Sequence, residues 1–354
     1  MKNFSRLALR LLVPCLALGS LGSCKSDDTT PTLGNWTTGN SFPGGLRQGA
    51  VSFIINNVAY VGTGIDATTA KYNDLWSYNP TTNSWVYLTP MPAAAGSRYY
   101  AVAFALNNKG YVGTGYDGTN YLSDFWEFDP AVNTSTTVGG VTTTTSGKWT
   151  QVASLPTVST GAARDYAVAG TVGSYGIVAC GYDGVNYKKD YYRFDGKAWT
   201  SFIFPGGKRS GAFGFTLNNQ FYVGGGTDNG TVVTDFYSYN PASDTWTPHH
   251  ELKNQTTGSD TYDNSGVNRV YGSGFVVNGK GYAVTGSNGS VLTSCYEYNS
   301  ASDTWTLKNP YVGLGRNSAV AFGIGDYGYV GMGGTSSSSR YDNIFKFDPN
   351  VAQQ

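Results

Sequence analysis

Short runs in which hydrophobic and polar residues alternate recur along the chain, and a turn signal follows most of them. One run covers residues 74–78, with the sequence DLWSY, and the turn signal after it covers residues 79–83, with the sequence NPTTN. Alternation with a period of two is the pattern of a β-strand with two different faces, and proline and asparagine favour tight turns. The pattern predicts a chain of short strands.

Two sequence markers divide these strands into six units at intervals of about fifty residues. The first marker is a glycine-rich strand such as YVGTG at residues 60–64, and the second is a tryptophan. The tryptophans are Trp36, Trp85, Trp149, Trp199, Trp246 and Trp305. A four-stranded unit that repeats at this period is typical of radially arranged sheets. The sequence therefore predicts an all-β fold, a six-bladed β-propeller.

The two ends of the chain predict how the ring of blades closes. Trp36 precedes the first unit, whereas the last unit ends at residues 347–350 before any tryptophan. We expect the segment around Trp36 to pair as the outer strand of the sixth blade, because this leaves no long strand edge open. The propeller is then expected to span residues 34–354.

The glycine-rich second strand, the aromatic third strand and the spaced tryptophan resemble the kelch family over roughly residues 34–350. Most units read GTG where the family favours a glycine doublet, which residues 224–225 and 333–334 approach. The resemblance is to bacterial kelch proteins that are grouped with galactose oxidase, and it implies the propeller fold. A shared fold does not imply a shared activity.

The N-terminus has the features of an export signal. Three basic residues precede an apolar run at residues 11–18 that is too short to span a bilayer. Residues 21–24, with the sequence LGSC, resemble a bacterial lipobox, which implies cleavage before Cys24 and its acylation. We expect a signal peptide at residues 1–23, a tether at residues 24–33, and an outer-membrane lipoprotein. It is expected at the cell surface, held to the membrane only by its lipid.

Charge argues against nucleic acid as a partner. The whole chain has 23 basic and 23 acidic residues, and loss of the signal peptide leaves the mature protein slightly acidic. We expect a monomer. Cys180 and Cys295 lie at different strand positions of the third and fifth units, so we expect buried thiols rather than a disulfide.

One arginine recurs in all six units, about six residues before the end of the innermost strand. These candidate ligand-binding residues are Arg47, Arg98, Arg164, Arg209, Arg269 and Arg316. We expect them to surround the mouth of the central channel, where guanidinium groups could bind an anionic group of a glycan or protein. Alternatively, each could pair with the residue that begins the third strand of its unit. That residue is aspartate in four units, but Ser294 and Asn343 in the last two, which makes Arg269 and Arg316 the best ligand-binding candidates.

Two loops on the expected arginine face share the pattern YDGxNY, at residues 116–121 and 182–187. Their ligand-binding candidates are Tyr116, Asp117, Tyr182 and Asp183. Tyrosine rings can stack on sugars. The Asp-Gly pair, however, is also the signal of a plain hairpin turn.

Residues for catalysis are sparse. The two histidines, His249 and His250, are adjacent, and neighbouring side chains rarely aim both rings at one metal ion. This disfavours the copper-radical activity of galactose oxidase, and we expect neither a metal nor a cofactor. The connection from His249 to Gly266 is expected to overhang the arginine face.

Three functions remain open on this basis. The first is a non-catalytic binding module for a glycan or protein ligand. The second is a small-sugar enzyme resembling the kelch-fold sialic acid mutarotases, which needs an acid or base such as Asp165, Asp260 or Asp263. The third is a structural interaction scaffold.

Overall fold

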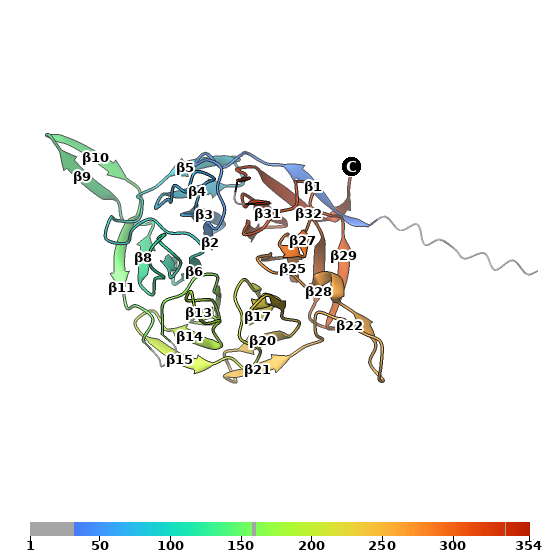
Figure 1. The fold of residues 1–354 in the computed structure, drawn as a ribbon. Coiled ribbons are helices and arrows are strands. Elements are labelled where there is room, and N and C mark those ends of the chain that lie inside the picture. The colour runs from blue at the N-terminus through green and yellow to red at the C-terminus, as the bar shows by residue number, and fades with distance from the viewer. Residues whose placement is uncertain (1–31, 158–160, 337) are drawn as a thin grey trace, which may run out of the picture. The chain divides into compact units, whose positions relative to one another are not determined.

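Six four-stranded antiparallel sheets surround a central axis in the computed structural model, which describes residues 32–157, 161–336 and 338–354 (Figure 1). The expected signal peptide and Cys24 lie outside these residues. The first three blades are formed by β2 (Val51–Ile55), β3 (Val58–Gly62), β4 (Leu75–Asn79) and β5 (Ser84–Tyr87); β6 (Val102–Leu106), β7 (Lys109–Gly113), β8 (Phe125–Asp129) and β11 (Lys148–Val152); and β12 (Val168–Val172), β13 (Tyr175–Ala179), β14 (Asp190–Phe194) and β15 (Trp199–Ile203).

The other three blades follow the same plan. They are formed by β16 (Phe213–Leu217), β17 (Gln220–Gly224), β20 (Phe236–Asn240) and β21 (Thr245–Pro248); β24 (Ser273–Val277), β25 (Lys280–Val284), β28 (Cys295–Asn299) and β29 (Thr304–Lys308); and β30 (Val320–Ile324), β31 (Tyr327–Gly331), β32 (Ile344–Ala352) and β1 (Leu33–Thr38). The prediction of a six-bladed β-propeller is confirmed.

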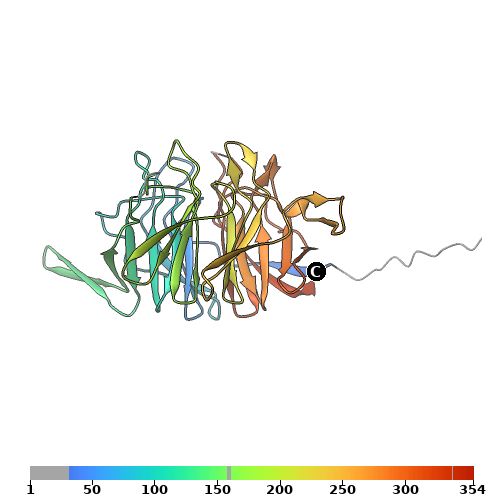
Figure 2. The ribbon, with the colours of Figure 1, turned by 90° about the horizontal axis from the view of Figure 1, so that it is seen from below.

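Small elements decorate the ring. The Thr-rich stretch between β8 and β11 forms the hairpin of β9 (Thr134–Val138) and β10 (Val141–Thr145), which projects outward in Figure 2. Three further pairs are β18 (Thr227–Asp228) with β19 (Thr231–Val232), β22 (Asn254–Gln255) with β23 (Tyr262–Asp263), and β26 (Ser287–Asn288) with β27 (Ser290–Val291). The 3-10 helix η1 covers Ser265–Val267. In the described part of the chain, no helix is long and apolar enough to cross a membrane.

The closure of the ring joins the two ends of the described chain. The sheet order β1-β32-β31-β30 places β1 as the outer strand of the sixth blade, with Trp36 opposite Phe347. The Trp36 ring is buried between Tyr311 and Phe347, at centroid distances of 5.1 and 4.5 Å. The expected closure by the N-terminal strand is therefore the one observed.

Tight packing between blades explains one repeated glycine. Phe53 of β2 stacks on Tyr60 of its own blade, and its ring also presses on Gly110 of the next blade, where a Cβ atom would collide with it. The same collision would occur between Phe104 and Gly176. Glycine is thus required where an aromatic ring of one blade reaches the second strand of the next.

A closed circle of backbone hydrogen bonds surrounds the axis. In each blade, the residue two places after the repeated arginine donates its N–H to the matching carbonyl oxygen of the preceding blade, at 2.8–3.1 Å. These six residues, called the axial ring here, are Gly49, Tyr100, Tyr166, Gly211, Tyr271 and Ser318. All have positive φ angles, from 48° to 64°. Such strained backbone is maintained in non-glycine residues only where the surroundings enforce it.

Candidate functional site

The repeated arginines lie in the interior of their own blades, and all six are fully buried. Each guanidinium group donates to the carbonyl oxygen sixteen residues later, just after the second strand, at 2.9–3.2 Å. Four also form ion pairs with the aspartate before the third strand. These pairs are Arg47–Asp74, Arg98–Asp124, Arg164–Asp190 and Arg209–Asp235. This geometry matches the pairing alternative, and ligand binding by these arginines stays a prediction.

Arg269 and Arg316 also have protein partners, contrary to the expectation that they lack one. Arg269 donates to the backbone oxygen and Oγ of Ser294 at 3.1 and 3.3 Å, and Arg316 donates to Asn343 Oδ1 at 2.8 Å. Serine and asparagine therefore accept at the position that aspartate occupies elsewhere. Burial lowers the pKa of Arg269 to about 10 and also lowers that of Arg316, because these acceptors are uncharged.

Tyrosines, rather than arginines, line one mouth of the central channel. Tyr100, Tyr166 and Tyr271 of the axial ring come from the second, third and fifth blades, and their rings meet at centroid distances of 3.9 and 4.5 Å. A cavity of about 160 Å³ lies beside them. It is lined mainly by Gln48, Tyr166, Tyr271, Asn317, Ser318 and Thr335. The channel mouth is therefore a small polar cavity with an aromatic wall.

The two predicted YDGxNY loops extend this aromatic wall outward. Tyr116 contacts Tyr99 and Tyr121, Tyr121 contacts Tyr182, and Tyr182 contacts Tyr187, at centroid distances between 4.7 and 6.1 Å. Tyr99 in turn contacts Tyr100 at 4.9 Å. The structure thus joins the predicted residues Tyr116 and Tyr182 to the channel mouth. We call the whole set the tyrosine arc: Tyr187, Tyr182, Tyr121, Tyr116, Tyr99, Tyr100, Tyr166 and Tyr271.

The aspartates of these loops stabilise turns. Asp117 accepts hydrogen bonds from the backbone N–H groups of Thr119 and Asn120. Asp183 accepts the equivalent bonds within its own loop and also pairs with Lys188. Burial opposes ionisation of Asp183, but the Lys188 contact and the backbone donors outweigh it and lower its pKa to about 2. Both carboxylates therefore have the contacts that the hairpin alternative predicts.

Asp165 is an acidic residue with unusual electrostatics directly beside the axial ring. It precedes Tyr166 directly, its exposed fraction is 5%, and burial raises its pKa to about 7. Its Oδ1 atom has no hydrogen-bond partner among the described residues. Burial, neighbouring tyrosines and the charge of Asp165 together raise the pKa of Tyr99 and of Tyr121 to about 12. Asp165 is thus a carboxyl group that changes protonation near neutral pH beside hydroxyl groups that stay protonated.

The other two suggested acids lie elsewhere. The His249–Gly266 connection projects from the rim between the fourth and fifth blades and does not overhang the channel mouth, contrary to expectation (Figure 1). Asp260 accepts from His250 at 2.8 Å, and Asp263 accepts from the N–H and Oγ of Ser265. Both carboxylates are therefore placed to stabilise this connection.

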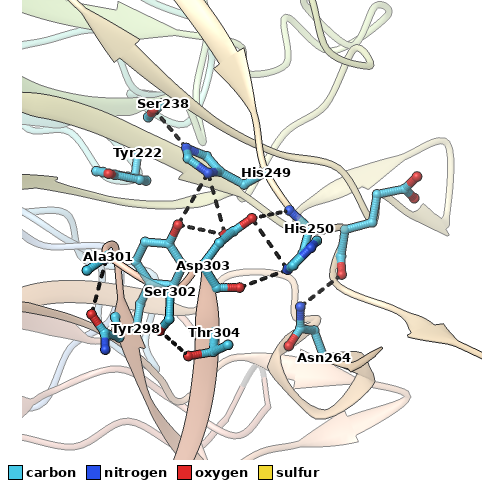
Figure 3. A network of polar contacts seen from close by, with 12 residues as sticks. Tyr222, Ser238, His249, His250, Asn264, Tyr298, Ala301, Ser302, Asp303 and Thr304 are labelled. Carbon is cyan, nitrogen blue, oxygen red and sulfur yellow. Dashed lines mark hydrogen bonds and ion pairs between the residues drawn. The ribbon is translucent and has the colours of Figure 1, made fainter. Parts of the chain in front are cut away.

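The adjacent histidines form a polar network between these two blades (Figure 3). His249 lies between Ser238 Oγ, 2.8 Å from its Nε2, and Asp303 Oδ1, 3.5 Å from its Nδ1. Serine, histidine and aspartate suggest a hydrolytic triad, but Ser238 is only 1% exposed and its hydroxyl donates to Gln220 Oε1. The serine proton is thus directed away from His249, which must itself donate from Nε2. The network joins the blades and does not activate a nucleophile.

Across residues 32–157, 161–336 and 338–354, no group of three or more His, Cys, Asp and Glu residues is arranged to hold a metal ion. Cys180 and Cys295 are buried free thiols, as expected, and burial raises the pKa of each to about 12. Such thiols are poor nucleophiles.

Residues 208–248, in the fourth blade, match the family described as Kelch motif. The match lies within one of six sheets that repeat the same plan, and it agrees with the resemblance to kelch repeats that the sequence carries. Similar proteins include the N-acetylneuraminate epimerase of Escherichia coli O1:K1 / APEC, which is 36% identical over 131 residues, and that of Shigella flexneri serotype 5b (strain 8401), which is 35% identical over 131 residues. Each match covers 35% of this chain and 34% of the relative, so about a third of the relative's length is matched.

Proposed function

We propose that this protein interconverts the two anomers of a carboxylate-bearing sugar, N-acetylneuraminate or a close relative, at the channel mouth. The observation that carries the proposal is Asp165, a buried carboxyl group with a pKa of about 7 beside the tyrosine arc. The similar proteins named N-acetylneuraminate epimerase support the choice of substrate. They favour the enzymatic alternative over a purely non-catalytic binding module.

The proposed reaction needs a proton acceptor and a proton donor, and one carboxyl group can serve as both. Ring opening removes the proton from the anomeric hydroxyl, breaks the bond between the anomeric carbon and the ring oxygen, and adds a proton to that oxygen. Closure on the opposite face of the carbonyl reverses these steps and requires no cofactor. Because its pKa is about 7, Asp165 can exist as base or acid at neutral pH.

Other side chains at the mouth have matching properties. Tyr166 and Tyr271 line the cavity and can make apolar contacts with a sugar. Their hydroxyl groups remain donors because burial first, and neighbouring tyrosines and Asp165 next, raise their pKa values. Arg340 supplies positive charge, which acts on Tyr100. We assign Arg340, rather than the buried arginines, to the substrate carboxylate. Arg340 was absent from the sequence candidates because it lies outside the repeat pattern.

The test is the rate at which a single anomer of N-acetylneuraminate equilibrates, followed by proton NMR with purified protein. Asp165→Asn removes the titrating group and should lower the catalysed rate by about a hundredfold or more. The catalysed rate of the wild-type protein should also change with pH around 7. Asp263→Asn is the matched control, because this exposed carboxylate lies on the distant connection. Full activity of Asp165→Asn would refute the assignment.

A non-catalytic glycan or protein receptor is the second candidate function. The tyrosine arc favours it, because a partly exposed row of eight aromatic rings is longer than a single small sugar requires. Specific binding of an oligosaccharide by wild-type protein that leaves the equilibration rate of the free sugar unchanged would support this candidate.

We also propose a lipid anchor at Cys24 and a location at the cell surface, both on the sequence of residues 1–28.

A further inference from the structure

A groove of about 710 Å³ lies between the third and fourth blades, at the outer end of the tyrosine arc. The connection between β13 and β14 forms one wall with residues 185–189. The opposite side is formed by Ile203 at the end of β15, Lys208 before β16, and Asn229 between β18 and β19. This volume is within the range of about 300–1,000 Å³ that is usual for small-molecule sites. The groove is distinct from the small cavity at the channel mouth.

The charged residues of the groove favour an anion. Three lysines line it, Lys188, Lys189 and Lys208, of which Lys189 and Lys208 are exposed. The carboxylate in the lining, Asp190, forms an ion pair with the buried Arg164 at 2.6 Å. Arg164 neutralises this carboxylate, Lys188 pairs with Asp183, and Lys208 lies 3.5 Å from Asp228. Lys189 adds a further exposed positive charge, so the groove has a net positive potential.

The uncharged residues of the groove favour a sugar that carries an apolar substituent. Val185 and Ile203 are 80% and 73% exposed, so they present methyl groups to the groove. Asn186 and Asn229 supply amide donors and acceptors of the kind that bind hydroxyl groups. Carboxylate, hydroxyl and acyl groups on one ligand would therefore each find a partner here.

Tyr187 connects this groove to the channel mouth. It lines the groove and also contacts Tyr182 in the tyrosine arc, at a centroid distance of 4.8 Å. Burial raises the pKa of Tyr271 at the mouth, and the charge of Tyr187 makes the next largest contribution to the resulting pKa of about 12. A ligand longer than one sugar could therefore extend along the face from one site to the other.

We propose that the groove is a second carbohydrate subsite, which binds a carboxylate-bearing, N-acylated sugar residue of an acidic glycan. The choice of sugar class rests on the proposed function, since a protein that acts on the free sugar acid would benefit from holding glycans that contain it. Lys189 and Lys208 bind the carboxylate, and Val185 and Ile203 contact the acyl methyl group.

The test is a calorimetric titration of the full mature protein with the methyl α-glycoside of N-acetylneuraminate. Its ring cannot open, because the anomeric oxygen is methylated, so the titration measures binding without turnover. The combined Lys189→Ala and Lys208→Ala variant should bind about tenfold more weakly, since each exposed charge contact contributes modestly. Lys197→Ala, an exposed lysine in the turn between β14 and β15, is the matched control and should bind as the wild type does. N-acetylglucosamine, which lacks the carboxylate, should bind more weakly than the glycoside.

Asp165→Asn separates this subsite from the channel mouth. If the groove holds the glycoside, Asp165→Asn should leave its affinity unchanged, whatever happens to the equilibration rate of the free sugar. Equal affinity of the double lysine variant and wild type, no binding to wild type, or loss of binding in Asp165→Asn alone would each overturn the groove proposal. Intact groove binding together with a rate that does not depend on Asp165 would instead refute only the proposed function.

Discussion

The repeated arginine joins the end of the second strand to the start of the third strand in every blade. Its fork of donors suits two acceptors at once, a backbone carbonyl oxygen and the side chain that begins the third strand. In the first four blades that side chain is a carboxylate, and in the last two it is neutral. The six blades therefore share one hydrogen-bond geometry, but the side-chain acceptor is charged in four of them and neutral in two.

Removal of a charge-paired arginine should destabilise the protein more than removal of a neutrally paired one. Arg98→Ala leaves the partly buried Asp124 without its partner, and we expect a loss of about 3 kcal/mol in the free energy of unfolding. Arg269→Ala leaves only neutral acceptors unpaired, at a cost of about 1–2 kcal/mol. Urea unfolding of both variants measures the difference. Equal losses would show that the carboxylates add nothing to the repeated contact.

His250 should make stability depend on pH. Its Nδ1 faces the Asp303 carbonyl oxygen and its Nε2 faces the Asp260 carboxylate, so only the doubly protonated ring donates to both. Burial disfavours the charged ring, but these acceptors outweigh it and raise the pKa of His250 above its ordinary value. Folding therefore favours the protonated form. The stabilisation by the charged ring is therefore fully present below the pKa that His250 has in the unfolded chain. It is lost as the pH rises through the higher pKa that His250 has in the folded protein.

The measurement is urea unfolding of wild type and His250→Asn at about pH 5.5 and pH 8. The stability advantage of wild type should be larger at the lower pH. Although burial opposes this, hydrogen bonds from the neighbouring histidines and Tyr298 lower the pKa of Asp303, so this carboxyl group stays ionised at both pH values. An advantage that grows with pH would contradict the assigned sign.

At the scale of elements, β1 is the one strand that reaches its blade from the opposite end of the chain. It pairs with β32 and brings Trp36 onto Tyr311 and Phe347. The indole Nε1 also donates to the Asn309 carbonyl oxygen at 3.1 Å. A single strand thus completes the sixth blade and covers the edge of β32.

Trp36→Ala should therefore weaken the whole ring. Loss of this buried ring should lower the free energy of unfolding by about 3–5 kcal/mol. Because the ring helps to hold β1 on β32, β1 should also detach more often, and the edge of β32 that this uncovers should promote aggregation. Trp85→Ala, at the equivalent position of the first blade but partly exposed, is the control and should cost less. A melting temperature of Trp36→Ala equal to that of wild type would mean that closure does not depend on the Trp36 ring.

At the scale of the whole molecule, the sequence predicted the blades better than the site. Strand alternation and turn residues are local signals, so six units and their closure could be read from spacing alone. The meeting of Tyr116, Tyr121 and Tyr182 depends on how neighbouring blades are rotated, which no local pattern contains. The pKa of Asp165 depends on its burial beneath side chains from elsewhere in the chain. Its position could be suggested, but its chemistry required the fold.

A substitution at Cys24 tests whether a lipid anchors the whole protein to a membrane. Cys24→Ser removes the thiol that the lipobox resemblance assigns to acylation, and should move the protein from the membrane fraction to the soluble fraction. The measurement is immunoblotting of both fractions, with Cys180→Ser as the control because that thiol is buried in the third blade. Unchanged membrane association of Cys24→Ser would remove the basis for the lipid anchor.

The axial ring should affect the rate at which the protein unfolds as well as the stability of its native state. Each of its six backbone hydrogen bonds joins neighbouring blades, so no blade can leave without exposing a donor on one side and an acceptor on the other. The bond from Gly49 to Ser318 spans about five times the sequence separation of the bond between the first two blades, yet this adds only about 1.5 kcal/mol of loop-closure entropy. Completion of the circle is therefore slow because it is non-local, but it is not thermodynamically expensive. Once complete, the circle should give the protein a long native-state lifetime, because unfolding must break the circle before any blade can separate.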